Sequence, residues 1–162
     1  LTTYDLATAG DLDKYRRYSD GCLALIVTLD QFPRHIFRGS PKSFESDEKA
    51  LSYARWAIEK RFDETYPPLV RVFIYLPFEH SENLKDQQRC VELMQALPDY
   101  SFKSENLRFA ERHLEIIERF GRFPHRNKIL GRGSTQEELT FLKEPDSSFI
   151  WPKNWYRNEN VK

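Results

Sequence analysis

Three polar segments carry the side chains best suited to chemistry, and Asp30 is the central residue of the first. It follows an apolar run, Cys22 to Leu29, and precedes the basic residues Arg34, His35 and Arg38. The helix dipole disfavours an anion near the C-terminal end of a helix, so Asp30 needs a partner. One interpretation is an internal ion pair with Arg34, Arg38 or an arginine of the third segment. The other is a general base or a metal ligand.

The second segment, Glu79-His80-Ser81-Glu82, places two carboxylates beside a histidine. If helical turns continue past Pro77, one side of the helix carries Arg71, Tyr75, Glu79, Glu82 and Asp86. A pair of carboxylates can do acid–base work when one is desolvated, and Glu with His can bind a divalent metal. The chain has neither His-x-x-x-His nor Glu-x-x-His, so a metal site is only weakly indicated, we assign no metal ligand, and no motif implies a cofactor.

The third segment, Arg119 to Ser134, holds five cationic side chains, one histidine and three glycines before a predicted helix start. Its Phe123-Pro124-His125-Arg126 echoes Phe32-Pro33-Arg34-His35 of the first segment. Arginine forks beside a helix N-terminus can bind phosphate or carboxylate. The alternative is that these arginines pair with acids of neighbouring helices or face water. The spacing is not that of a nucleotide-binding Walker loop.

Covalent catalysis has no support in the sequence. There is no Gly-x-Ser-x-Gly segment, and Cys22 lies in an apolar helix, where a thiol is inert. His113 lies on an apolar stripe and is predicted to be a satisfied core histidine.

The elements that position these segments are all predicted to be helices. Gly10 is expected to end the first helix, at Ala9. Asp20 is the expected N-cap of the next long helix, and Pro33 is expected to stop that helix at Phe32. Ser134 with Glu137 fits a capping box for the last. The predicted helices cover Thr3–Ala9, 11–18 as a short turn, Gly21–Phe32, Ser43–Lys60, a stretch from Pro67 to Pro77, a stretch ending at Leu97, Lys103–Phe120 and Gln136–Leu142. No alternating strand pattern occurs, so we expect an all-α fold of antiparallel helical hairpins, as a bundle or short solenoid.

Length and composition predict one helical domain, residues 1–149, and an irregular aromatic tail, residues 150–162. With 162 residues, 40% of them apolar, the chain can bury one core. The formal net charge is zero, so no nucleic-acid partner is expected. No apolar run approaches the roughly 20 residues of a membrane span. Cys22 and Cys90 fit neither a metal knuckle nor a disulfide framework, which favours a reducing compartment, the cytoplasm or an organelle matrix.

Taken together, the three segments resemble the bacterial and eukaryotic family known as domain of unknown function 924. The similarity extends from about Ala7 to Phe149, and its motifs are 25–39, 75–82 and 120–132. It implies an all-helical, tetratricopeptide-like fold and supplies no activity, cofactor or catalytic residue. Members of the family usually begin with a further helix containing a Phe-Trp-Phe-like segment, which is expected to be missing before Leu1. They also carry Asn where this chain has His35.

Because the resemblance falls on the same polar segments, we expect them to converge on one pocket. The candidate catalytic residues are Asp30, Glu79, His80 and His125. The candidate ligand-binding residues are Arg34, Arg38, Glu82, Arg122, Arg126, Asn127 and Arg132.

Three functions stay open at this stage, and the sequence does not decide whether the protein is an enzyme. The leading hypothesis is an interaction or ligand-binding module whose pocket holds a small anionic group. The second is a hydrolase-type enzyme for a small anionic substrate, which calls for a concave pocket containing a strongly shifted pKa. The third is an accessory subunit of a larger assembly, favoured by the aromatic tail with Trp151, Trp155 and Tyr156.

Overall fold

The computed structural model describes residues 2–145 and 147–149, and every regular element in that part of the chain is helical. This confirms the predicted all-α class. The chain forms two compact units, residues 1–123 and 124–162. That residues 1–149 form a single domain stays a prediction. In the first unit the helices are α1 (Thr3–Ala9), η1 (Asp13–Arg17), α2 (Ser19–Ile36), η2 (Pro41–Phe44), α3 (Asp47–Glu59), η3 (Asp63–Thr65), α4 (Pro68–Glu79), α5 (Leu84–Ala96) and α6 (Lys103–Phe120). The second contains η4 (Pro124–Arg126) and α7 (Gln136–Phe141).

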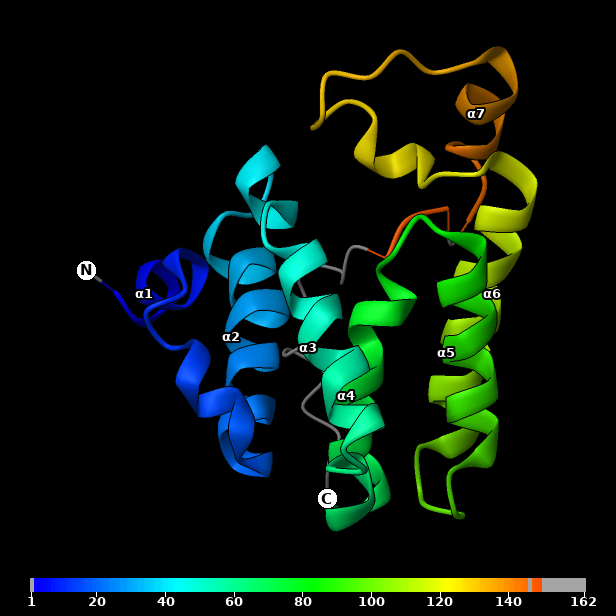
Figure 1. Cartoon of the computed structure of the whole chain (residues 1–162). Coiled ribbons are helices and arrows are strands. Elements are labelled where there is room, and N and C mark those ends of the chain that lie inside the picture. The colour runs from blue at the N-terminus through cyan, green and yellow to red at the C-terminus, as the bar shows by residue number, and fades with distance from the viewer. Residues whose placement is uncertain (1, 146, 150–162) are drawn as a thin grey trace, which may run out of the picture. The chain divides into compact units, whose positions relative to one another are not determined.

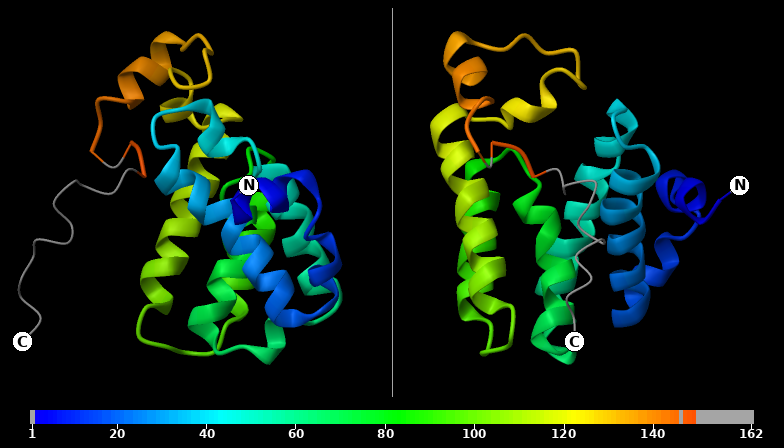
Figure 2. Two further views of the ribbon diagram at one scale, coloured as in Figure 1. Left: turned by 90° about the vertical axis from the view of Figure 1, so that its left-hand side faces the viewer. Right: turned by 180° about the vertical axis from the view of Figure 1, so that it is seen from behind.

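The first unit stacks its helices in chain order, as Figure 1 shows from α1 to α6. α2 packs on α3 and α4, α4 also packs on α5 and α6, and α5 packs on α6. The view from behind in Figure 2, on the right, shows the same order. Short connections between helices that pack on each other give the expected antiparallel hairpins. The core between them is aliphatic and aromatic, and it includes Ile26, Leu29, Tyr53, Ile74 and Met94.

Two helix ends follow the sequence pattern closely. α1 stops at Ala9 because Gly10 adopts a φ of 96°, in the left-handed region that a residue without Cβ reaches at little cost. α6 spans the predicted Lys103–Phe120, and Gly121, with a φ of 66°, ends it in the same way. Both predictions are confirmed.

The expected end of α2 at Phe32 is wrong, because the helix continues through Pro33 to Ile36. Proline cannot donate the hydrogen bond that Leu29 O would otherwise receive. Ser46 supplies it instead, since its hydroxyl donates to Leu29 O at 2.6 Å. The start of α2 also differs from the prediction: it begins at Ser19, and Asp20 lies in its first turn and not at the cap.

Other boundaries differ by shorter distances. The predicted helix Ser43–Lys60 divides into η2 and α3, so Asp47 becomes the first residue of α3. α4 runs only two residues past Pro77, so Glu82 and Asp86 do not continue its face. The capping box of α7 uses Thr135 and Glu138, one residue beyond the predicted pair. The predicted tail, 150–162, lies outside the described residues. No helix in the described part of the chain is long and apolar enough to cross a membrane.

Candidate functional site

Asp30 is the centre of a buried polar cluster in the first unit. Its side chain lies on α2 and the residue is fully buried. Gln31 Nε2 donates to its Oδ2 at 2.5 Å, and His80 Nδ1 lies 2.7 Å from its Oδ1. Burial alone would raise the pKa of this carboxyl, but the neighbouring His80 and Arg34 and these hydrogen bonds bring it down to about 2. Asp30 is therefore an anion at neutral pH.

Arg34 lies one turn further along α2 and joins two carboxylates. Its two terminal nitrogens donate to Asp47 Oδ1 and Oδ2 at 2.8 and 3.0 Å, a bidentate pair. Its Nη1 also lies 3.3 Å from Asp30 Oδ1 and donates to the Asp30 carbonyl at 2.7 Å. The ion pair expected between Asp30 and Arg34 is thus present, and Arg34 ties the start of α3 to α2.

His80 follows the last residue of α4 and brings the second polar segment to the first. Burial, together with the charge of Arg34, lowers the pKa of its imidazole, while Asp30 opposes that shift. The ring is therefore neutral at neutral pH. Since Asp30 is an acceptor, Nδ1 carries the ring proton and donates it to Asp30, which leaves the lone pair on Nε2.

Glu79 precedes His80 and is 5% exposed. Burial, and then the negative charge of Asp30, raise the pKa of its carboxyl to about 8, with Arg34 opposing. Glu79 is therefore mostly a neutral carboxylic acid at neutral pH. Its Oε1 lies 3.4 Å from Nδ1 of His113, the same nitrogen that lies 2.8 Å from the Phe109 carbonyl. His113 is a buried core histidine, as its apolar stripe predicted.

Gln87 of α5 holds the end of α4 in place. This side chain is fully buried, and its Nε2 donates to the carbonyls of Phe78, Glu79 and Ser81 at 3.3, 2.6 and 2.6 Å. The last carbonyls of a helix have no intrahelical donor, and Gln87 supplies one. Sequence reasoning missed Gln87, because a glutamine in an amphipathic helix gives no sign that it is buried.

Comparison with known proteins places these residues in a family. The family model described as "Bacterial protein of unknown function (DUF924)" matches residues 1–146. The chain belongs to this family. It is similar to a solved protein of unknown function, ATU0120 from Agrobacterium tumefaciens, with 41% identity and a TM-score of 0.80 over 86% of this chain and 77% of that one. A search of the curated proteins found no match.

In this DUF924 member, the first two signature segments meet through Asp30 and His80. The other predicted residues of the first unit are Glu82, Arg38 and Arg122. Glu82 accepts the backbone N–H of Phe123 at 2.8 Å, so it fastens the end of α6 to the turn after α4. Arg38 is exposed beyond α2, and Arg122 is half-buried beyond α6.

The remaining predicted residues belong to the second unit, where Asn127 organises the loop before α7. Its Nδ2 donates to Ser134 Oγ at 3.1 Å and to Glu138 Oε2 at 3.3 Å. Its Oδ1 accepts from Arg132 Nε at 3.0 Å. Arg126 is buried, and the His125 ring packs edge-on against Phe149. That these residues face the Asp30 cluster stays a prediction.

Metal chemistry has no obvious site in this cluster. Within the described part of the chain, no group of three or more His, Cys, Asp or Glu side chains is arranged to hold a metal ion. What the cluster offers is an oriented neutral imidazole on His80 and a protonated carboxyl group on the residue before it, Glu79.

Proposed function

We propose that the Asp30 cluster is the active site of a hydrolase that acts on a small, electrically neutral ester or amide. The observation that carries this proposal is the buried carboxylate of Asp30 at Nδ1 of His80, where the preceding residue, Glu79, has a buried carboxyl group whose pKa is about 8. A strongly shifted pKa in a polar cluster is the feature expected of acid–base catalysis.

His80 is the general base in this proposal. Asp30 fixes the tautomer and the orientation of the ring, as a carboxylate does for the histidine of a catalytic triad. Nε2 then removes a proton from a water molecule, whose oxygen attacks the substrate carbonyl. When the carbon–oxygen or carbon–nitrogen bond breaks, the leaving group takes the proton back from His80. The imidazole side chain is 14% exposed, so it is the member of the pair that a substrate can reach.

Glu79 supplies the electrophilic group. As a neutral acid it donates a hydrogen bond to the carbonyl oxygen, which becomes negative as water attacks. An ionised glutamate would repel that charge. Burial beside Asp30, which keeps the proton on Glu79, therefore also makes it a donor at neutral pH.

The state of Arg34 favours a neutral substrate over the anionic one expected from the sequence. Its terminal nitrogens already bind Asp47 and Asp30. An anion would have to displace a carboxylate from it, at a cost in lost hydrogen bonds. The interaction-module and accessory-subunit hypotheses stay predictions.

The test compares the wild-type protein with His80→Gln across a panel of neutral p-nitrophenyl esters and anilides. We expect the variant to lose about 100-fold or more in kcat/KM. His35→Gln is the matched control, because His35 is exposed on the same helix as Asp30, and it should keep full activity.

The pH profile is a second measurement. Activity should rise as His80 loses its proton, below the ordinary histidine range, and fall as Glu79 ionises near pH 8. A wild-type protein no faster than His80→Gln on every substrate would contradict the proposal.

A further inference from the structure

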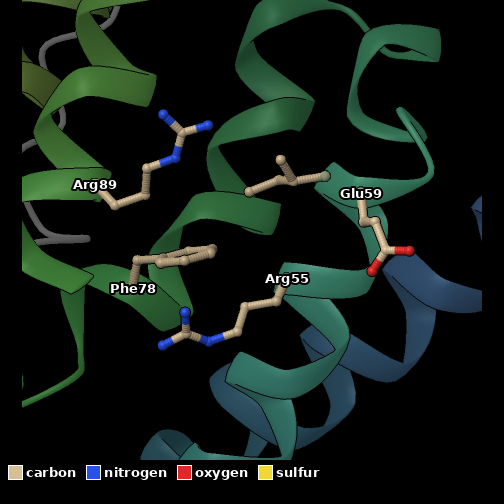
Figure 3. Close-up of a pocket in the computed structure, with 5 residues that line it drawn as sticks. Arg55, Glu59, Phe78 and Arg89 are labelled. Carbon is tan, nitrogen blue, oxygen red and sulfur yellow. The ribbon is translucent and has the colours of Figure 1, made fainter. Parts of the chain in front are cut away.

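A second concave site lies in the first unit, between α3, α4 and the start of α5. Its cavity of about 340 Å³ is lined by Arg55, Ile58, Glu59, Phe78 and Arg89. Figure 3 shows Arg55 and Arg89 reaching it from different helices, with the Phe78 ring between them. None of the lining residues belongs to the Asp30 cluster. The volume is near the lower end of the range for small-molecule sites, roughly 300 to 1,000 Å³.

Arg55 is held in position at this cavity. Its guanidinium pairs with Asp86 and lies 5.5 Å from the centroid of the Phe78 ring, within cation–π range. Asp86 is buried and also accepts from the Ser81 hydroxyl at 2.8 Å. Arg55 is therefore fixed by Asp86 and by the Phe78 ring, and it forms one charged edge of the cavity.

Arg89 is held much more loosely. Its contact with Glu92 at 2.9 Å joins residues three apart on α5, and the two side chains are 48% and 63% exposed. Exposed ion pairs of this type contribute little to stability, because both side chains are well solvated when they are apart. Arg89 can therefore exchange Glu92 for a better-placed oxyanion at little cost.

We propose that this cavity binds a small aromatic monocarboxylate, with its carboxylate on Arg89 and its ring against Phe78 and Ile58. The charge balance favours one negative charge, since Asp86 already neutralises Arg55 and Lys60 pairs with Glu59, which leaves Arg89 with only an exposed partner. A dianion would be repelled by the carboxylates of Asp86 and Glu59. The ligand needs an aromatic ring because Phe78 and Ile58 give the cavity an apolar wall between the two guanidinium groups.

The test is isothermal titration calorimetry of the full chain with benzoate. Wild type should show saturable binding, and Arg89→Gln should weaken it at least about tenfold. Arg61→Gln is the matched control, since Arg61 also pairs with a glutamate three residues on, Glu64, and should bind benzoate like wild type. Acetate, which lacks the ring, and benzamide, which lacks the charge, should each bind at least about tenfold more weakly than benzoate.

Three results would overturn the proposal: no saturable binding of benzoate, equal affinity in wild type and Arg89→Gln, or an equal loss in both arginine variants. Circular dichroism of Arg89→Gln serves as the folding control, and its exposed side chain makes a folded variant the expected outcome. The measurement does not depend on His80, so a failure here leaves the proposed hydrolase untouched.

Discussion

Replacing Glu79 by glutamine should change how the stability of the protein depends on pH. Burial and the charge of Asp30 raise the pKa of Glu79 from 4.5 to about 8. In the unfolded chain the same carboxyl is solvated and titrates near its ordinary value. Glutamine has almost the same size and never ionises, so the substitution removes this difference between the two states.

The sign and the size of this change in stability follow from proton linkage. Below the unfolded pKa both states hold the proton, and Glu79 contributes no pH dependence. As the pH rises towards about 8, the unfolded state releases the proton and the folded state retains it, so the free energy of unfolding falls. The slope is about 1.4 kcal/mol per pH unit. Between about pH 5 and about pH 8, wild type should lose about 3.5 kcal/mol relative to Glu79→Gln.

Urea denaturation followed by far-ultraviolet circular dichroism at several pH values measures this difference. Glu118→Gln is the control, because Glu118 is an exposed glutamate on α6, and its profile should run parallel to that of wild type. If the Glu79→Gln profile were also parallel to wild type, Glu79 would titrate alike in both states. The reasoning about a protonated Glu79, and with it the proposed oxyanion donor, would then be refuted.

Three further predictions concern groups that position the cluster or lie in the core. Gln87→Met should lower the free energy of unfolding by about 2 to 4 kcal/mol, because the Glu79 and Ser81 carbonyls lose the donor that Gln87 supplies, whereas Gln88→Met at the exposed neighbour should lower it by under about 0.5 kcal/mol in the same urea assay. Ser46→Ala should lower the free energy of unfolding by about 1 to 3 kcal/mol in the wild-type background. In the Pro33→Ala background, where residue 33 has a backbone N–H that can donate to Leu29, the same substitution should lower it by clearly less. Equal losses in the two backgrounds would contradict this prediction. Cys22, whose pKa burial raises to about 11, should react with a thiol reagent only on unfolding, so rapid labelling of the native protein would be the contrary result.

The sequence predicted helices whose ends depend on local chemistry. α6 carries a clear apolar stripe and a glycine at its end, and both of its boundaries were correct. The end of α2 was wrong because the group that compensates for Pro33 comes from Ser46, in the chain just before the next helix. Local rules for proline cannot include a donor that comes from outside the helix, 13 residues after the proline.

The sequence predicted which residues belong to the site better than it predicted the contacts between them. A lone acid at the end of an apolar helix indicated that Asp30 needs a cation, and Arg34 provides it. The contact with His80 spans 50 residues and needs α2 and α4 to pack side by side, which sequence spacing cannot establish. The protonated state of Glu79 follows from burial, and the helical face assumed for this segment ended two residues past Pro77.

The proline in α2 helps to explain why the cluster lies where it does. Asp30 and Arg34 share one face of α2 only if the helix continues past Pro33, because residues four apart lie on the same side. Ser46 makes that continuation possible by donating to the carbonyl that Pro33 leaves without a partner. The next residue, Asp47, then binds both terminal nitrogens of Arg34. Ser46 and Asp47 thus compensate for the proline and hold Arg34 in place beside Asp30, whose Oδ1 also orients His80.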